Sequence, residues 1–219
     1  MSEPFEWDDK RKYDRGKVLD AKALDEVEKF GRYVDVDGDG IGQRTLPGTH
    51  PEKGAFFTRG TSRDEYAIYT ESPEIYERNM QRLLKKWETA ATLVPPAEVS
   101  GSKESVGIIY YGTSMLPMQE ALDRLAEQGI RLDTMRIRSF PFGKEVWQFI
   151  AEHDFVFVVE QNRDAQMKTL LVNEGGLNPA NLVEVLYYAG LSISADFIAD
   201  AVATYFDETN RPKLTEVTS

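Results

Sequence analysis

The 219-residue sequence contains no cysteine and only two histidines, His50 and His153. Without cysteine the chain has no disulfide framework, no thiolate nucleophile and no thiolate ligand for zinc or an iron–sulfur cluster. Two histidines are too few for most histidine metal sites and argue against a Ser-His-Asp device. These two shortages exclude cysteine chemistry and argue against chemistry based on histidine.

Basic residues are also scarce, because 26 Lys and Arg stand against 37 Asp and Glu, a formal net charge of −11. A negative field repels nucleic-acid phosphates and anionic membranes, so we expect no nucleic-acid or membrane partner. The apolar runs are shorter than a membrane span, and the acidic residues 1–7 lack the basic-then-apolar pattern of a signal peptide. These features predict a cytoplasmic protein.

The clearest pattern is an apolar run at 155–159 that stops at the polar residues 160–164. Such a run with Val and Phe is typical of a strand buried on both faces. Helical spacing follows it, with Asn162 as a candidate N-cap, and a buried strand leading into a helix is the unit of a parallel α/β sheet. The polar turn would lie at the carboxyl end of its strand, where open α/β sheets contact ligands or partners.

The same alternation extends over residues 105–219, where strands are expected at 106–111, 130–137 and 182–188, with helices between them. This pattern predicts a three-layer α/β/α domain. A long amphipathic helix is predicted at 73–94, because Ser72 can cap it and Pro73 suits its first position. Residues 95–104 are predicted to be a linker after a loop-rich arm, so residues 1–100 and 105–219 form separate parts.

An acidic loop carries Asp35, Asp37 and Asp39 at alternate positions, followed by Gly40. This spacing matches the first half of a calcium loop, although the twelfth position is Leu46 instead of a bidentate Glu. The alternative is a glycine-rich turn whose Asp side chains accept hydrogen bonds from the backbone. Both interpretations stay open here: a Ca²⁺ or Mg²⁺ site at the three aspartates, or a turn without metal.

Five segments resemble the α chain of 2-oxoacid:ferredoxin oxidoreductases, most closely the branch that uses 2-oxoglutarate. They are 35–49 (DVDGDGIGQRTLPGT), 54–66 (GAFFTRGTSRDEY), 79–94, 135–142 (MRIRSFPF) and 157–166 (FVVEQNRDAQ). The resemblance implies a domain similar to the C-terminal domain of transketolase at 105–219. It also implies that residues 1–100 are the end of a pyrimidine-binding thiamine domain.

The resemblance further implies an enzyme that converts a 2-oxoacid to acyl-CoA and CO₂ and passes electrons to ferredoxin. Its cofactors would be thiamine diphosphate with Mg²⁺ and an iron–sulfur cluster. Its partners would be a β subunit and the remaining α and γ domains, with ferredoxin and coenzyme A acting on the complex.

The chain departs from this family, because no Tyr-Pro-Ile-Thr-Pro-like segment is present. Gly38-Asp39-Gly40 resembles the start of a thiamine diphosphate motif, but the first Asn after it is Asn79, too far downstream. We therefore assign no catalytic or cofactor-binding residue, and expect the cofactors on other chains or missing domains. The chain is expected to be a C-terminal portion of an α subunit that supports assembly and is inactive alone.

Candidate contacts to a substrate or partner are His50, Arg59, Glu160, Asn162 and Arg163, which all lie in predicted polar loops. The competing hypothesis is a stand-alone α/β binding module with a calcium-stabilised acidic loop. A portion of a larger subunit should expose an extended apolar surface, whereas a self-sufficient module should not.

Overall fold

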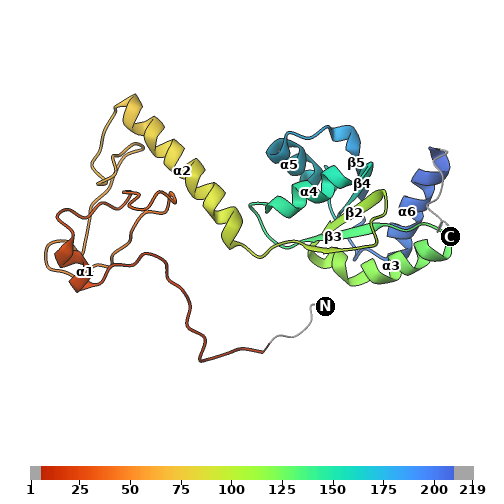
Figure 1. Cartoon of the computed structure of the whole chain (residues 1–219), viewed down its shortest axis with the longest axis horizontal. Helices are drawn as coiled ribbons and strands as arrows, with labels where there is room; N and C mark the ends of the chain where they lie inside the picture. Colours follow the sequence, from red (N-terminus) through yellow and green to blue (C-terminus); the bar gives the residue numbers. More distant parts are fainter. Residues whose placement is uncertain (1–5, 210–219) are drawn as a thin grey trace. The chain divides into compact units, whose positions relative to one another are not determined.

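A computed structural model describes residues 6–209, which form two compact units, 6–93 and 94–209 (Figure 1). The division falls between Leu93 and Val94. This moves the boundary expected from the sequence, because the predicted linker contains strand β1 (Glu98–Ser100), which pairs with β3 (Asp133–Ile137). Residues 98–100 therefore belong to the sheet of the second unit and not to a linker.

The second unit is built on a five-stranded sheet with the order β1-β3-β2-β4-β5. The other strands are β2 (Val106–Tyr111), β4 (Phe155–Glu160) and β5 (Leu182–Leu186). β2 pairs in parallel with β3 and β4, and β4 pairs in parallel with β5, whereas β1 is antiparallel to β3. The predicted parallel sheet is confirmed, with one antiparallel strand at its edge.

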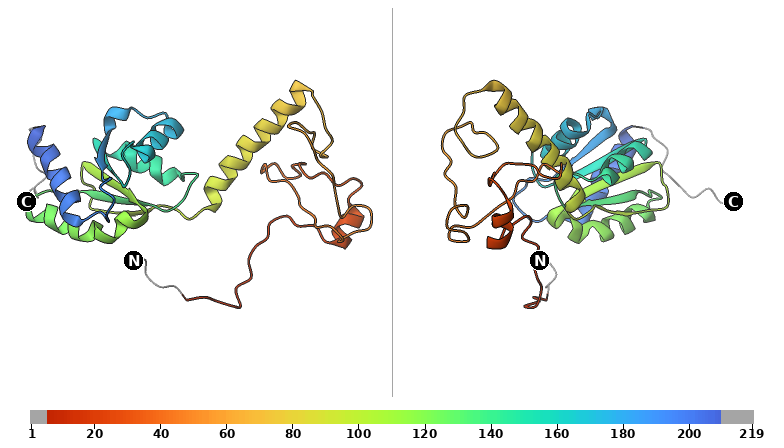
Figure 2. Two further views of the ribbon diagram at one scale, coloured as in Figure 1. Left: turned by 180° about the vertical axis from the view of Figure 1, so that it is seen from behind. Right: turned by 60° about the vertical axis from the view of Figure 1, so that its left-hand side comes forward.

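Helices cover both faces of this sheet (Figure 2). α3 (Met115–Glu127) and α6 (Ala195–Glu208) pack with residues such as Ile108 and Phe157 in one core cluster. α4 (Lys144–Glu152) and α5 (Gln166–Gly175) pack with Ile109 and Val158 in a second cluster on the other face. Two short 3-10 helices, η1 (Gly112–Ser114) and η2 (Pro179–Asn181), lie in the connections. The three-layer α/β/α class predicted from the sequence is confirmed.

Strand β4 is central, as its unbroken apolar run predicts. All six of its residues are buried, and β2 and β5 lie on its two sides. Successive side chains point to opposite faces, so Phe157 enters one core cluster and Val158 the other. This burial on both faces explains the apolar run at 155–159, which only the hydrogen-bonded Glu160 ends.

Two predicted strands are shorter than expected. The strand expected at 130–137 begins only at Asp133, because the N–H of Ile130 bonds back to the carbonyl of Leu125 and closes the end of α3. Ile130 is buried there in a turn, so its apolar character does not reflect a strand. The strand expected at 182–188 ends at Leu186.

The first unit contains helices α1 (Ala21–Glu26) and α2 (Pro73–Leu93), and its other described residues are loops with isolated bridges. The predicted long helix is confirmed to within one residue. Among the apolar residues described in this unit, only Leu24 and Ala67 are buried, and α2 buries none of its 21 residues. None of the described helices combines the length and the hydropathy needed to cross a membrane.

Candidate functional site

The polar turn after β4 lies where the sheet reverses its winding. β3 and β4 flank β2 on opposite sides. The chain therefore passes from β2 to β3 on one side, and then crosses back past β2 to form β4 on the other side. The carboxyl ends of β2 and β4 meet at this point, which is the place where open α/β sheets form their binding crevices. Tyr111 ends β2 and Glu160 ends β4.

Glu160 is fully buried and its carboxylate holds the start of α5. One oxygen accepts the backbone N–H of Met167 at 2.7 Å, and the other accepts that of Lys168 at 2.9 Å. The side-chain amide of Asn162 donates to the same carboxylate at 2.7 Å. The first N–H groups of a helix have no partner within the helix, and a carboxylate there is also favoured by the helix dipole.

The cap of α5 thus differs from the sequence prediction. Ala165 occupies the cap position with φ of 48° and contributes no side-chain bond. The predicted cap, Asn162, accepts the N–H of Asp164 at 3.1 Å and of Gln166 at 3.3 Å through its side-chain oxygen. Asn162 therefore orders the turn that precedes the helix, while Glu160 satisfies the next two N–H groups.

The two strand ends are joined by a second set of hydrogen bonds. The side-chain amide of Gln161 donates to the hydroxyls of Thr113 at 2.8 Å and of Ser114 at 3.1 Å. The Tyr111 hydroxyl lies 3.5 Å from Glu160 Oε2, and burial together with this negative neighbour raises its pKa. Tyr111 therefore stays a neutral phenol at physiological pH. The sequence pattern missed Tyr111, Thr113 and Ser114, although each follows or ends a predicted strand.

The predicted contact residues of this turn have different environments. Glu160 has no exposed surface, which corrects the expectation that it contacts a substrate or partner. Arg163 is exposed and pairs with its neighbour Asp164 at 2.7 Å. Gln161 is exposed and Asn162 is half-buried. An incoming molecule could reach Gln161, Asn162 and Arg163, whereas Glu160 acts within the fold.

His50 and Arg59 belong to the unit 6–93. The His50 Nδ1 accepts the backbone N–H groups of Glu52 at 3.1 Å and Lys53 at 2.9 Å. Its proton must then be on Nε2, which lies 3.1 Å from Asp25 Oδ1. His50 thus ties its loop to α1, while Arg59 is exposed. A contact of either residue with a substrate or partner stays a prediction.

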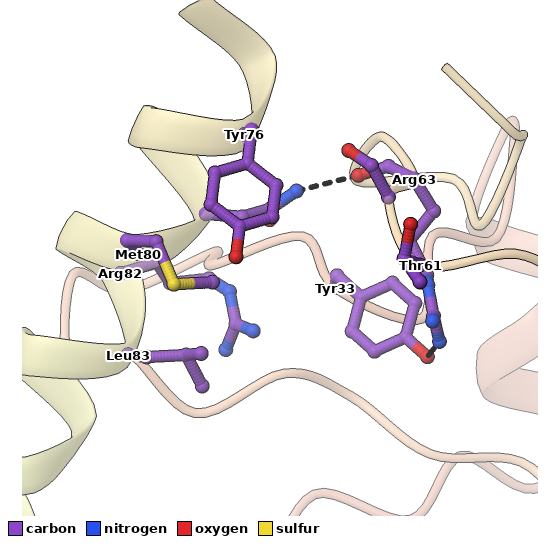
Figure 3. A pocket seen from close by; sticks show the side chains of 9 residues that line it. Tyr33, Thr61, Arg63, Tyr76, Met80, Arg82 and Leu83 are labelled. Carbon is purple, nitrogen blue, oxygen red and sulfur yellow. Dashed lines mark hydrogen bonds between the residues drawn. The ribbon is translucent and has the colours of Figure 1, made fainter. Parts of the chain in front are cut away.

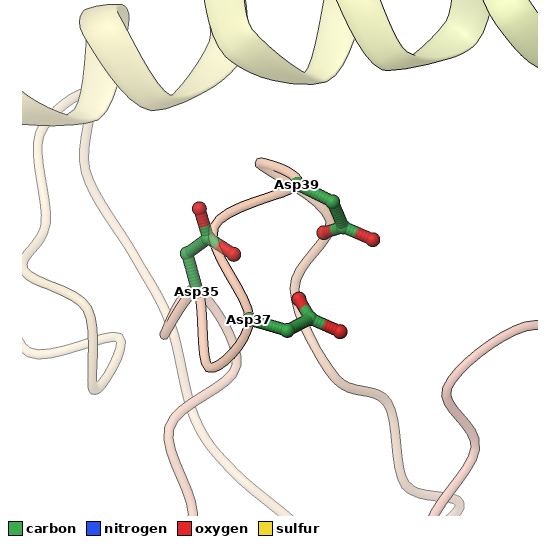
Figure 4. Close-up of side chains that lie close together, drawn as sticks. All are labelled: Asp35, Asp37 and Asp39. Carbon is green, nitrogen blue, oxygen red and sulfur yellow. The ribbon is translucent and has the colours of Figure 1, made fainter.

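The acidic loop brings its three carboxylates together, with ligand atoms within 4.8 Å of one another (Figure 4). Lys17 Nζ lies 2.5 Å from Asp37 and 2.6 Å from Asp39, and it also donates to the carbonyl of Ile41 at 3.1 Å. Asp35 accepts the N–H groups of Gly38 and Gly40. The ammonium of Lys17, followed by the N–H of Ile41, lowers the pKa of Asp39. A divalent ion would have to displace this ammonium, and the metal site stays a prediction.

These contacts also test the partial thiamine diphosphate motif. Asp39 is bound to Lys17 and Ile41, while the side-chain amide of Asn79 donates to the carbonyl of Arg63 at 2.6 Å. The two side chains therefore serve separate local contacts and do not fit the Asp–Asn pair that would hold the magnesium of a diphosphate.

No protein-family model matches the sequence. The chain is 30% identical over 171 residues to the α subunit of 2-oxoacid:ferredoxin oxidoreductase 2 of Aeropyrum pernix, covering 75% of this chain and 25% of that relative. It is 25% identical over 195 residues to the 2-oxoacid:ferredoxin oxidoreductase α subunit of Saccharolobus solfataricus, covering 86% and 29% of the two chains. The chain thus spans little more than a quarter of the length of these relatives.

A solved structure shares the fold. It is the 2-oxoglutarate:ferredoxin oxidoreductase from Magnetococcus marinus with 2-oxoglutarate, coenzyme A and succinyl-CoA bound. The TM-score is 0.69 at 22% sequence identity, and the match covers 80% of this chain and 30% of the other. At this identity the likeness supports the fold, and the ligands are those of the Magnetococcus protein.

Proposed function

Because the chain is related in sequence to part of the α subunits of 2-oxoacid:ferredoxin oxidoreductases, we propose that it is the C-terminal portion of such a subunit. The match to the Aeropyrum protein carries this proposal, since it extends over 171 residues. Residues 94–219 number only 126, so the aligned part includes residues of the loop-rich unit as well as the α/β unit.

The surface of α2 supports a subunit over a stand-alone module. Apolar side chains recur along one face of the helix and remain 37–58% exposed: Tyr76, Met80, Leu83, Leu84 and Trp87. A contiguous apolar face of this kind marks an interaction surface. The unit 6–93 also buries few of its described apolar residues, as expected for a part completed by other polypeptide.

In this proposal the complete enzyme transfers the acyl group of a 2-oxoacid to coenzyme A, releases CO₂ and passes two electrons to ferredoxin. We propose 2-oxoglutarate as the 2-oxoacid, on the likeness of the five segments to that branch. Thiamine diphosphate and an iron–sulfur cluster would be held outside this chain, because it has no cysteine and because Asp39 and Asn79 do not form a fitting diphosphate site among the described residues. The chain itself would support assembly and the fold around the active site.

Reconstitution tests this function. The purified chain should not reduce a viologen dye with 2-oxoglutarate and coenzyme A, whereas the complex with the remaining subunit portions should. Turnover by the chain alone would overturn the proposed role. So would failure to associate with any other part of the oxidoreductase.

A paired substitution on α2 tests the apolar face. Replacing Leu84 and Trp87 with Gln should weaken co-purification with the other subunit portions, because their burial in the interface would be lost. Lys85→Gln is the matched control, since Lys85 points away from the apolar face and its surface pair with Glu88 contributes little. Equal recovery of the complex with both variants would contradict the role of this face.

A further inference from the structure

Three guanidinium groups gather around one tyrosine ring in the unit 6–93. The Cζ atoms of Arg32, Arg63 and Arg82 lie 5.5, 5.7 and 5.8 Å from the centre of the Tyr33 ring. Their hydrogen bonds go to uncharged acceptors, including the Tyr33 hydroxyl for Arg63 at 3.1 Å and the Gly40 carbonyl for Arg82 at 2.7 Å. Within residues 6–209, none of the three forms an ion pair. Three like charges are thus held together in a chain whose net charge is −11.

Two carboxylates beside this cluster already have other partners. Glu65 pairs with Arg78 at 3.6 Å. The two oxygens of Asp35 accept the N–H groups of Gly38 and Gly40 at 3.0 and 2.9 Å. Both acids line a hollow that adjoins the cluster, yet neither bonds to its guanidinium groups. The three guanidinium groups are therefore left without a direct carboxylate partner among the described side chains.

A cavity of about 230 Å³ opens beside Tyr33, Arg63 and Arg82 (Figure 3). Two residues of its lining also carry a donor with no hydrogen-bond partner and almost no accessible surface, the hydroxyl of Ser62 and the Nε of Arg82, which lie just behind the cavity wall. The opposite wall is apolar and comes from α2, with Met80 and Leu83 facing the cavity. The lining thus combines cations, unpaired donors and an apolar wall.

We propose that this cavity binds a short-chain carboxylate. Arginine matches the geometry of a carboxylate, and rotation of the Ser62 and Arg82 side chains would bring their unpaired donors to a charged acceptor in the cavity. It would also relieve the repulsion among the three guanidinium groups. The hydrocarbon part of the ligand would lie against Met80 and Leu83, and the small volume excludes a nucleotide. This site does not depend on the oxidoreductase proposal.

Titration of the full chain with sodium butyrate at constant ionic strength tests the site, with chloride as the reference anion. Butyrate should raise the melting temperature in a saturable manner, as a ligand of the folded state does. Arg63→Gln should raise the dissociation constant by about tenfold or more, the loss expected for a charged hydrogen bond. Lys22→Gln removes one positive charge from an exposed position outside the cavity and should bind butyrate as the wild type does.

Ser62→Ala provides a variant that is safe for folding. Its hydroxyl is buried without a partner, so its removal should leave the free chain as stable as before or more stable. Butyrate binding should nevertheless weaken severalfold. The proposal is overturned if butyrate gives no saturable stabilisation, or if Arg63→Gln and Ser62→Ala bind it like the wild type. Tighter binding of inorganic phosphate than of butyrate would overturn the assignment to a carboxylate with an apolar body.

Discussion

At the scale of the residue, Glu160 connects strand β4 to helix α5 through one buried carboxylate. It accepts two backbone N–H groups from the first turn of the helix and one side-chain amide. Removing an acceptor from a buried site leaves its donors unpaired, and this costs more than the net value of the hydrogen bonds. Glu160 is therefore a stability residue at a position where the sequence pattern indicated a surface contact.

Glu160→Gln should destabilise the unit 94–209 by about 2–3 kcal/mol, because an amide nitrogen cannot accept a backbone N–H. Urea unfolding followed by circular dichroism measures the change. Arg163→Ala in the same turn is the control and should change stability by less than about 0.5 kcal/mol, since that side chain is exposed. Equal unfolding midpoints for the two variants would refute this role of Glu160.

The contact of Lys17 with the acidic loop predicts a pH dependence. Lys17 lowers the pKa of Asp39 below its ordinary value of 3.8. The ion pair therefore stabilises the folded chain fully above this pH, and this stabilisation is lost as the pH falls through the lowered pKa. Burial by itself lowers the pKa of Lys17, but the hydrogen bonds and negative charges of Asp37 and Asp39 outweigh this effect. The net result is a pKa above the ordinary value of 10.5. On the alkaline side the stabilisation is complete below 10.5 and is lost as the pH rises through the raised pKa.

Lys17→Met should therefore move the pKa of Asp39 up toward 3.8. A carboxyl ¹³C NMR titration would show the change. An unaltered titration curve would mean that the N–H of Ile41, and not the ammonium, determines the pKa of Asp39.

The same substitution tests the predicted metal site. Calcium should stabilise Lys17→Met more than the wild type, because the metal no longer competes with the ammonium for Asp37 and Asp39. A variant with Asp35, Asp37 and Asp39 all changed to Asn should not respond. If calorimetry detects no heat with millimolar calcium for either the wild type or Lys17→Met, the loop is a turn without metal.

Sequence reasoning found the three carboxylates but not the cation that binds them. Alternating Asp residues and a following Gly are visible as a local pattern. Lys17 precedes Asp37 and Asp39 by 20 and 22 residues, and no periodicity links the two segments. The same limit applies to the cluster around Tyr33, which combines loop residues with residues of α2. Contacts between distant loops depend on chain reversals that composition does not encode.

At the scale of the element, a strand is predicted correctly from the sequence when its burial leaves a clear apolar pattern. Strand β4 is predicted correctly from the sequence because both of its faces are buried, so its first five residues are all apolar. The start of β3 is misplaced because Ile130 and Leu132 are buried in the connection before the strand and resemble strand residues. Apolar residues in a sequence indicate burial, but they indicate a helix or a strand only when they recur with the period of that element.

Val158→Asp should unfold the unit 94–209 or reduce its stability by several kcal/mol, because it places an unpaired charge between β2 and β5. Val99→Asp in β1 is the matched control, since Val99 lies in a strand but is 55% exposed. Far-UV circular dichroism melting distinguishes the two. A cooperative melt of Val158→Asp close to that of the wild type would contradict the central position of β4.

At the scale of the whole molecule, the buried apolar clusters lie entirely within one unit. Both clusters draw all of their members from residues 97–206. The unit 6–93 contributes few buried apolar side chains among its described residues and consists mainly of loops. The sequence predicts two parts of this kind, but it placed their boundary too late because three-residue strand β1 lacks any apolar pattern.

A fragment of residues 94–219 should therefore fold alone and unfold at the same urea concentration as the α/β unit of the full chain. Circular dichroism of both proteins provides the comparison. A fragment that is unfolded, or whose midpoint is clearly lower, would show that the sheet depends on residues 6–93.

Strand β1 also protects the solubility of the sheet. It pairs antiparallel with β3 from Glu98 opposite Arg136 to Ser100 opposite Thr134, and covers the backbone of that strand. A bare, five-residue β3 would offer free N–H and carbonyl groups to the β3 of another molecule, which is the usual route to edge-to-edge aggregation. Beginning the fragment at Ser105 instead of Val94 would remove this cover, so the shorter polypeptide should self-associate where the longer one stays monodisperse.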